Sequence, residues 1–309
     1  MTTQLAQEQG SKPVVGLALG SGSARGWAHI GIIQALEDIG VQPQVVAGTS
    51  IGALVGGAYV TGSLDAFADW VETLTVKDVF GLLDISFSGG MVKGEKLFGF
   101  FREHHANPDI ETLDKKLVTV ATDMQSGREV WITEGKMLDA ARASCALPGL
   151  FSPVKRQGRW MLDGGLVNPV PVSAARAMGA DVVIAVNLNA QLVGAHMARD
   201  SRAQVDQAGG SDEERSIWNK MMDYFSSSDG EDPGFFDVVA SSINIMQDRI
   251  TRSRMAGDPP EVTLVPMLED FALMDFHRAK EAIEEGRALV KRYEADILAW
   301  VGSPLADRV

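Results

Sequence analysis

The sequence predicts an α/β protein whose mainly parallel sheet is covered by helices on both faces. The chain has 309 residues, of which 45% are apolar, so it can bury the core of one large domain. Several short apolar runs have the continuous pattern of strands that are buried on both faces. Helical patterns lie between many of these runs, and strands that alternate with helices favour a parallel sheet.

The first strand is predicted at residues 14–19, VVGLAL, and a loop rich in glycine and serine follows it. A helix comes next and ends near Gly40, because glycine commonly terminates a helix. Ile32, Leu36 and Ile39 lie on one face of this helix. The chain therefore begins its folded part with a strand, a loop and a helix.

The second strand is predicted at residues 45–47, directly before the sequence GTSIG at residues 48–52. Residues 51–59 are apolar or small on every side, as expected of a helix that is buried all round. The uncharged stretch between Asp38 and Asp65 is long enough to span a bilayer. Glutamines, a proline and a turn in its middle favour a buried strand–turn–helix instead.

The remaining elements continue the alternation. Further strands are predicted at residues 116–122, 128–133, 159–163, 181–188 and 261–266. Helices are predicted at residues 137–146, 171–178 and 237–255, and from about 275 to 301.

The domain organisation follows from shifts in composition. We expect residues 1–13 to be a disordered lead-in, since they lack the basic start and apolar core of a signal peptide. Residues 14–309 then form a single domain. From about residue 189 to 234 the chain is rich in Ser, Asp, Gly and Gln, which predicts a polar, partly mobile excursion. A capping box before an apolar stripe at residues 218–225 predicts either a surface helix or a lid or oligomer contact there.

Composition excludes several classes of function. The net charge of −13 repels phosphate backbones, so we expect no nucleic-acid partner. Cys145 is the only cysteine, which excludes an intramolecular disulfide and a cysteine-based zinc site. We expect no bound metal and a cytoplasmic location, where thiols stay reduced.

The sequence GTSIG matches the pattern G-x-S-x-G between a predicted strand and a predicted helix. A sharp turn in that context raises the side chain of Ser50 clear of the backbone, and Gly48 and Gly52 leave room for the close approach. Small residues also allow close helix packing, which is the alternative role for this stretch. The strand before it and the buried helix after it favour Ser50 as a nucleophile.

The loop LGSGSARGW at residues 19–27 places three glycines between a strand and a helix. Backbone N–H groups in such a loop bind a phosphate or the oxyanion of an acyl-transfer intermediate. A dinucleotide site would need glycine where Arg25 stands, and an acidic residue at the end of the second strand, where Ala47 and Gly48 occur. We therefore expect no dinucleotide and no other cofactor.

The sequence DGGLVNPVP at residues 163–171 follows a predicted strand and places Asp163 before two glycines. An Asp-Gly pair is commonly an ordinary turn. The functional alternative is that Asp163 lies beside Ser50 as a base, with the glycines allowing the backbone to pass close to the nucleophile.

Taken in this order, the glycine loop with Arg25, the G-x-S-x-G sequence and the D-G-G sequence resemble the patatin-like phospholipases. Within that family, the chain looks most like the bacterial branch that is similar to neuropathy target esterase. The resemblance covers nearly the whole chain, through RASCALPGLFSPV at residues 142–154, SRMAGDPPEVTLVP at 253–266 and DFHRA at 275–279.

The resemblance implies a three-layer α/β/α patatin-like hydrolase domain. It implies a serine hydrolase of the phospholipase A or lysophospholipase kind, with Ser50 as nucleophile and Asp163 as base in a Ser-Asp dyad that forms an acyl-enzyme. It also implies an oxyanion hole in the loop formed by Gly20, Gly22, Ser23, Arg25 and Gly26. Many relatives have an unbroken glycine run in this loop, so a positive φ at Ser21 or Ser23 would be less favourable here.

The implied partner is a lipid or lysophospholipid substrate, and a transient membrane-surface contact and a homo-oligomer stay open. The Phe- and Leu-rich segment at residues 79–101 is either ordinary core or the wall of an acyl site.

One alternative function is an α/β-hydrolase-like esterase with a Ser-Asp-His triad, which would require His29 or His277 as the base. We expect packing or capping roles for these two histidines. The other alternative is a non-catalytic regulatory protein on a patatin-like fold.

Overall fold

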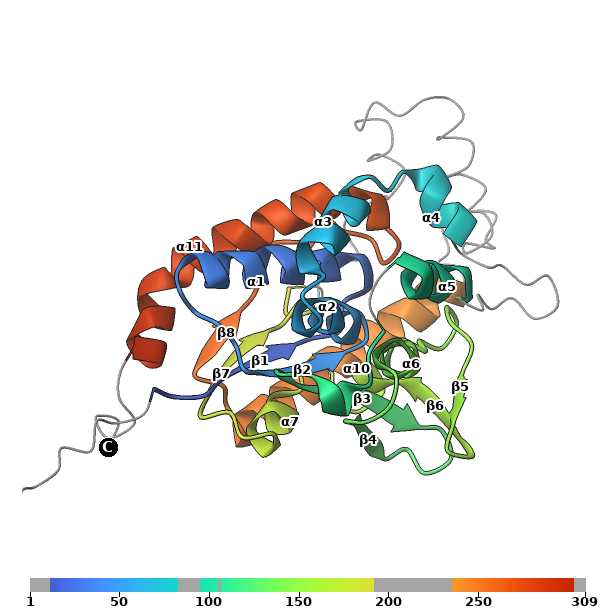
Figure 1. Ribbon diagram of the computed structural model, residues 1–309. Helices are drawn as coiled ribbons and strands as arrows, with labels where there is room; N and C mark the ends of the chain where they lie inside the picture. The colour runs from blue at the N-terminus through green and yellow to red at the C-terminus, as the bar shows by residue number, and fades with distance from the viewer. Residues whose placement is uncertain (1–11, 83–94, 105–106, 192–234, 303–309) are drawn as a thin grey trace, which may run out of the picture.

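The computed structural model describes residues 12–82, 95–104, 107–191 and 235–302. Within these ranges, eight strands form one sheet, and helices lie against both of its faces (Figure 1). The predicted α/β class and its three layers are therefore confirmed. Most of the predicted lead-in and of the polar excursion, with its apolar stripe, lies outside the described residues.

The strands are β1 (Val15–Leu19), β2 (Val45–Thr49), β3 (Lys116–Asp123), β4 (Glu129–Ile132), β5 (Val154–Arg156), β6 (Arg159–Asp163), β7 (Val182–Val186) and β8 (Val262–Leu264). Their order in the sheet is β5-β6-β3-β2-β1-β7-β8, and β4 also pairs with β3. The run from β3 to β8 is parallel, whereas β4, β5 and β6 pair antiparallel. The sheet is thus mainly parallel, as predicted.

The helices are α1 (Ala28–Asp38), α2 (Ile51–Val60), α3 (Leu64–Glu72), α4 (Val76–Leu82), α5 (Glu95–His104), α6 (Met137–Ser144), α7 (Val172–Ala177), α10 (Phe235–Gly257) and α11 (Ala279–Gly302). Short 3-10 helices are η1 (Ser23–Trp27), η2 (Ile110–Thr112), η3 (Gly164–Leu166) and η4 (Phe276–Arg278). In the described ranges, no helix combines the length and apolar character needed to cross a lipid bilayer.

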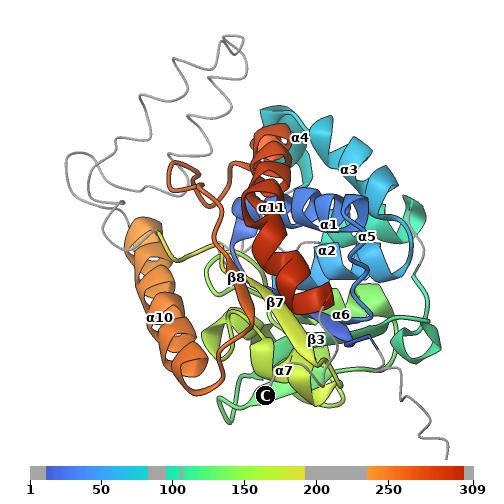
Figure 2. The same cartoon turned by 90° about the vertical axis from the view of Figure 1, so that its left-hand side faces the viewer.

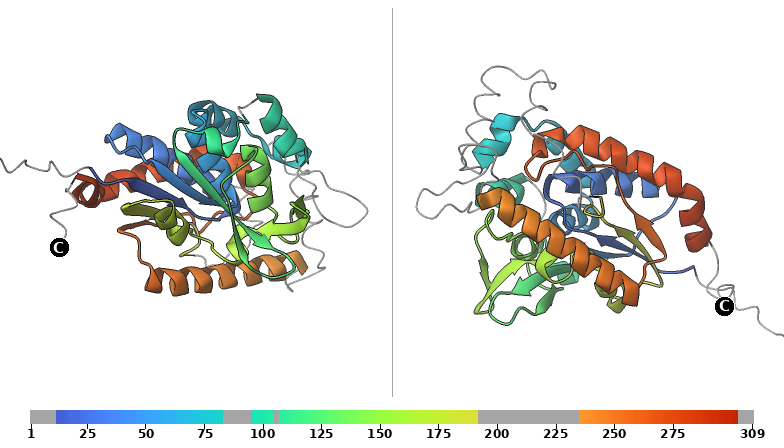
Figure 3. Two further views of the ribbon diagram at one scale, coloured as in Figure 1. Left: turned by 60° about the horizontal axis from the view of Figure 1, so that its bottom comes forward. Right: turned by 180° about the vertical axis from the view of Figure 1, so that it is seen from behind.

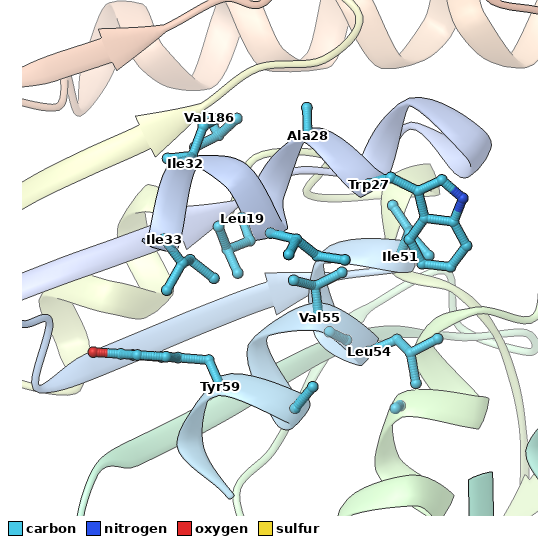
Figure 4. Close-up of a cluster of buried hydrophobic side chains, with 14 of the residues drawn as sticks. Leu19, Trp27, Ala28, Ile32, Ile33, Ile51, Leu54, Val55, Tyr59 and Val186 are labelled. Atoms are coloured by element: carbon cyan, nitrogen blue, oxygen red, sulfur yellow. The ribbon is translucent and has the colours of Figure 1, made fainter. Parts of the chain in front are cut away.

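One face of the sheet is covered by α1, α2 and α11. Figure 2 shows α11 lying alongside α1, and two glycines make this close packing possible. A Cβ on Gly31 would lie 1.9 Å from the carbonyl oxygen of Ile283, and a Cβ on Gly286 would lie 2.2 Å from that of Ala28. Figure 4 shows the core beneath these helices, where apolar side chains of α1 and α2 meet Leu19 of the sheet.

A second core lies on the opposite face of the sheet. Val172, Ala174 and Ala175 of α7 pack there against small side chains of the central strands, including Ala18 and Ala47. The long helix α10 crosses this side of the molecule, as both views in Figure 3 show. The sheet therefore has buried faces on both sides, which explains why its central strands are almost entirely apolar.

The predicted strands are all present, and their ends differ from the prediction by at most two residues. The helix after GTSIG is buried at each of its ten positions, as predicted. The last helix begins at Ala279 and not at about residue 275, because the chain first forms the 3-10 helix η4. The strand β5 was not predicted, because none of its three residues is buried and they form no apolar run.

Candidate active site

The register of β3 explains why two distant segments meet at one point. β4 runs along one edge of β3 at residues 119–122. β2 therefore occupies the other edge, where its last pair joins Thr49 to Val120. β6 follows on that same edge at the next residue, where Asp163 pairs with Ala121. The residue that follows β2 is thus brought directly beside Asp163.

That residue is Ser50, and its backbone forms the sharp strand-to-helix turn predicted for GTSIG. Its φ of 56° and ψ of −124° lie outside the regions that residues other than glycine readily adopt. The flanking glycines leave the necessary space. A Cβ on Gly48 would lie 2.5 Å from the Cα of Ala53, and a Cβ on Gly52 would lie 2.2 Å from the carbonyl oxygen of Leu19.

The turn places the hydroxyl of Ser50 against the carboxyl of Asp163. Ser50 Oγ donates a hydrogen bond to Oδ2 of Asp163 at 2.6 Å, and the N–H of Gly165 donates to Oδ1 at 2.7 Å. Asp163 is completely buried, and this burial raises the pKa of its carboxyl to about 6, although both hydrogen bonds act in the opposite direction. The carboxyl therefore changes protonation state close to neutral pH.

Ser144 holds the backbone of the strained turn at Ser50 through hydrogen bonds. Its Oγ accepts a hydrogen bond from the N–H of Ser50 at 2.8 Å and donates one to the carbonyl oxygen of Val120 at 2.5 Å. Ser144 has no exposed surface. Ser144 lies within the stretch RASCALPGLFSPV, but no local pattern in the sequence marks a residue 94 positions away as a partner of Ser50.

We expect Ser144→Ala to lower the free energy of unfolding by about 1–3 kcal/mol, because a buried donor and a buried acceptor would lose their partner. Urea unfolding followed by circular dichroism measures the change. The matched control is Ser242→Ala, since Ser242 is exposed and its hydroxyl binds only a carbonyl of its own helix. Equal losses in the two variants would show that Ser144 does not support the turn.

Two residues of the glycine loop lie at the wall of the site and have backbone N–H groups without an acceptor among the described residues. The N–H groups of Gly20 and Ser21 already donate to carbonyl oxygens, at 3.1 and 2.8 Å. Among the described residues, none accepts a hydrogen bond from the N–H of Gly22 or of Ser23. Gly22, Ser23 and Ser50 line one cavity. Two unpaired N–H groups beside a hydroxyl can bind an oxygen that becomes negatively charged.

Arg25 fixes the direction of one of these donors. Its side chain is 1% exposed, and its Nε donates to the carbonyl oxygen of Gly22 at 3.2 Å. Across a trans peptide the C=O and the following N–H point in opposite directions, so the N–H of Ser23 is turned away from Arg25. Burial lowers the pKa of Arg25 to about 10, so the guanidinium remains charged at neutral pH.

Ser23 has a φ of 52°, a left-handed conformation that is less favourable for serine than for glycine. Its Oγ donates to the carbonyl oxygen of Leu273 at 2.6 Å, which holds it in place. Gly22 has an extended φ of 171°, so it is needed for space: a Cβ there would lie 2.5 Å from Cδ1 of Leu188. Gly26 is likewise packed against the first turn of α2.

The cavity beside Ser50 is lined mainly by apolar side chains. They come from α3 to α5, from residues 147–151 and from the segment before α11: Trp70, Leu74, Val79, Leu97, Phe98, Leu147, Leu150, Phe151, Leu273 and Phe276. Part of the predicted segment 79–101 therefore lines this cavity. Phe101 instead packs its ring against Phe67 and Trp70, and residues 83–94 lie outside the described residues.

Two amide side chains of α10 line the same cavity. Asn244 and Gln247 are 7% and 4% exposed, and they lie one helical turn apart. The sequence predicted this helix but not these residues. Their spacing alone does not distinguish a cavity wall from an ordinary polar helix face.

His29 and His277 do not line the cavity in the part of the chain that the structure describes. His29 Nε2 lies 2.8 Å from the carbonyl oxygen of Gly20 and donates to it. Burial lowers the pKa of His29 to about 4, so its ring is neutral and supports the glycine loop. His277 lies in the 3-10 helix η4, before α11.

Known proteins resemble this chain over most of its length. A family model described as patatin-like phospholipase matches residues 17–176. An uncharacterized NTE family protein of Mycobacterium bovis is 34% identical, over 90% of this chain and 91% of that protein. Lysophospholipase nte1 of Emericella nidulans is 24% identical over 95% of this chain but only 19% of the fungal protein. Among solved structures, VipD of Legionella pneumophila aligns with a TM-score of 0.46 at 14% identity, covering 92% of this chain and 67% of VipD.

The matched range includes the glycine loop, Ser50 and Asp163, and it spans more than half of the chain. The relationship to the Mycobacterium bovis protein extends over nine-tenths of the chain. On these two findings, the chain belongs to the patatin-like phospholipase family.

Proposed function

We propose that this protein is a serine hydrolase that releases fatty acids from lipid esters through a Ser50–Asp163 dyad and an acyl-enzyme. One observation carries the proposal: Ser50 Oγ donates a 2.6 Å hydrogen bond to Asp163 at the wall of an apolar cavity. Membership of a phospholipase family and similarity to fungal lysophospholipases support a lipid ester as the substrate.

The first step is attack of Ser50 Oγ on the ester carbonyl carbon. As the new C–O bond forms, the hydroxyl proton moves to Oδ2 of Asp163, and the electron pair of the carbonyl moves to its oxygen. The N–H groups of Gly22 and Ser23 are the candidate donors to this oxyanion. A donor of this kind contributes about 3–4 kcal/mol to stabilising the transition state.

In the second step the tetrahedral intermediate collapses. The bond between the carbonyl carbon and the alcohol oxygen breaks, and that oxygen takes the proton from Asp163, leaving the acyl group on Ser50. A water molecule then attacks the acyl carbon while Asp163 removes its proton, and Ser50 regains a proton as it leaves. A carboxyl with a pKa of about 6 can both accept and return the proton near neutral pH.

The rest of the cavity fits this reaction. Its apolar side chains suit an acyl chain, which gains free energy on leaving water. Cys145 also lines the cavity, but burial raises the pKa of its thiol, so it stays protonated and does not compete with Ser50 as a nucleophile.

The test combines two measurements on the folded full-length chain. Incubation with a fluorophosphonate should add one phosphonyl group, seen in the intact protein mass, because such probes react with an activated serine. Incubation with a lysophospholipid should release free fatty acid. A folded protein that neither reacts with the probe nor releases fatty acid from lysophospholipids or simple esters would overturn the proposal.

A further inference from the structure

The cavity has an apolar part and an amide part, and the amide part has no role in the reaction steps above. Helix α10 crosses the molecule on the side of the sheet opposite α1 and α11 (Figure 3). It presents Ile243, Asn244 and Gln247 to the cavity. The two amides are therefore held on a helix, which fixes their positions better than a loop would.

A chain of hydrogen bonds determines how Gln247 is oriented. The guanidinium of Arg25 can only donate, and its Nη2 donates to Oδ1 of Asn189 at 3.2 Å. The Nδ2 of Asn189 therefore faces Gln247, and it donates to Oε1 of Gln247 at 2.8 Å. Ser21 Oγ donates to the same oxygen at 2.9 Å. Oε1 is thus fixed in the interior, and Nε2 of Gln247 points the other way.

The Nε2 group lies next to the dyad. A Cβ added to Gly165 would lie 2.4 Å from Nε2 of Gln247 and 3.0 Å from Oδ1 of Asp163, so the two groups lie close together beside Gly165, and both residues line the cavity. No described residue accepts a hydrogen bond from this Nε2. Its two N–H bonds are available to a ligand beside Asp163.

Asn244 is a second unpaired amide on the same helix face, one turn before Gln247. It is 7% exposed, lines the cavity and makes no hydrogen bond with any described residue. An amide without a protein partner at the wall of a cavity can donate both N–H bonds to a bound molecule that carries acceptor oxygens.

The reaction requires the alcohol part of the ester to lie on the Asp163 side. Asp163 must return its proton to the alcohol oxygen, whereas the acyl chain occupies the apolar part of the cavity. We infer that Asn244 and Gln247 bind the acceptor oxygens of the polar alcohol leaving group, the glycerol hydroxyl and phosphodiester of a lysophospholipid. This inference rests on the proposed function and names the part of the substrate that α10 recognises.

The experiment compares two substrates that share one acyl chain and differ only in the leaving group: 1-palmitoyl lysophosphatidylcholine and p-nitrophenyl palmitate. We expect Asn244→Leu to lower the ratio of kcat/KM for the lysophospholipid to kcat/KM for the p-nitrophenyl ester by about tenfold or more. Asn244→Asp keeps the shape but replaces the N–H donors with an oxygen that repels phosphate, so it should lower the ratio at least as far. The control is Ser242→Leu on the exposed face of α10.

The outcomes separate the two hypotheses. A wild-type protein that hydrolyses neither substrate contradicts the proposed function, and the inference falls with it. A wild-type protein that hydrolyses both, together with an unchanged ratio in both Asn244 variants, overturns the inference alone. An equal fall in Ser242→Leu would assign the effect to the helix as a whole and would also overturn it.

Discussion

Ser50→Ala should reduce ester hydrolysis by at least about 10⁴-fold and abolish labelling by a fluorophosphonate. Removing a catalytic serine eliminates the covalent route, and the remaining groups retain only what the oxyanion donors and substrate binding supply. Initial rates with p-nitrophenyl palmitate and the intact mass after probe treatment measure the two effects. The fold should persist, because alanine removes one hydroxyl from a half-buried side chain whose backbone is held by Ser144.

The control for this variant is Ser126→Ala, an exposed serine in the turn between β3 and β4. It should react with the probe and hydrolyse esters like the parent protein. A folded Ser50→Ala protein with the parental rate would show that another residue forms the covalent intermediate, and peptide mapping of the labelled parent would identify it.

The sequence predicts the dyad because each half of it is a local pattern. GTSIG follows an apolar strand run, and DGG follows another, so both chemical groups lie at the carboxyl ends of strands. What brings them together is the register of β3, which pairs first with β2 and then with β6 along one edge. That pairing depends on long-range packing, and no spacing in the sequence encodes it.

The residues that support the dyad and line the cavity were harder to predict from the sequence than the dyad itself. Ser144 reaches Ser50, and Gln247 reaches Ser21, through contacts between residues 94 and 226 positions apart. The amphipathic pattern of α10 predicts a helix with one polar face, but a polar face usually meets water. Only the packed structure shows that Asn244 and Gln247 are buried beside a cavity.

The conformation of the glycine loop could be predicted only in part from the sequence. The sequence shows that a positive φ at Ser21 or Ser23 would be less favourable than in an unbroken glycine run, and the structure places one at Ser23. The compensating contact is the hydrogen bond from Ser23 Oγ to the carbonyl of Leu273, which comes from the far end of the chain. Local preference shows only that a positive φ at Ser21 or Ser23 would be unfavourable, whereas which serine adopts it, and what stabilises it, depends on tertiary contact.

Asp163→Asn should lower kcat by at least about a hundredfold, because the amide keeps the shape of the carboxyl but cannot take the proton of Ser50. The parent protein should lose kcat/KM as the pH falls below about 6, since burial raises the pKa of Asp163 to about 6 and the protonated form is no base. This acidic limb should disappear from the residual activity of the Asp163→Asn protein. Burial lowers the pKa of His29 to about 4, so this histidine does not account for a limb near 6.

Stability gives an independent check on the same carboxyl. A folded-state pKa raised above the unfolded value of 3.8 stabilises the fold at acid pH, and this contribution is lost as the pH rises through about 6. Asp163→Asn removes the cost of ionising a buried group, so its free energy of unfolding relative to the parent should be higher at pH 8 than at pH 4.

His29→Gln and His277→Gln should keep measurable labelling by the fluorophosphonate and measurable ester turnover. If one of these histidine variants, still folded, loses all labelling while Asp163→Asn retains it, a histidine is the base and the dyad assignment is wrong.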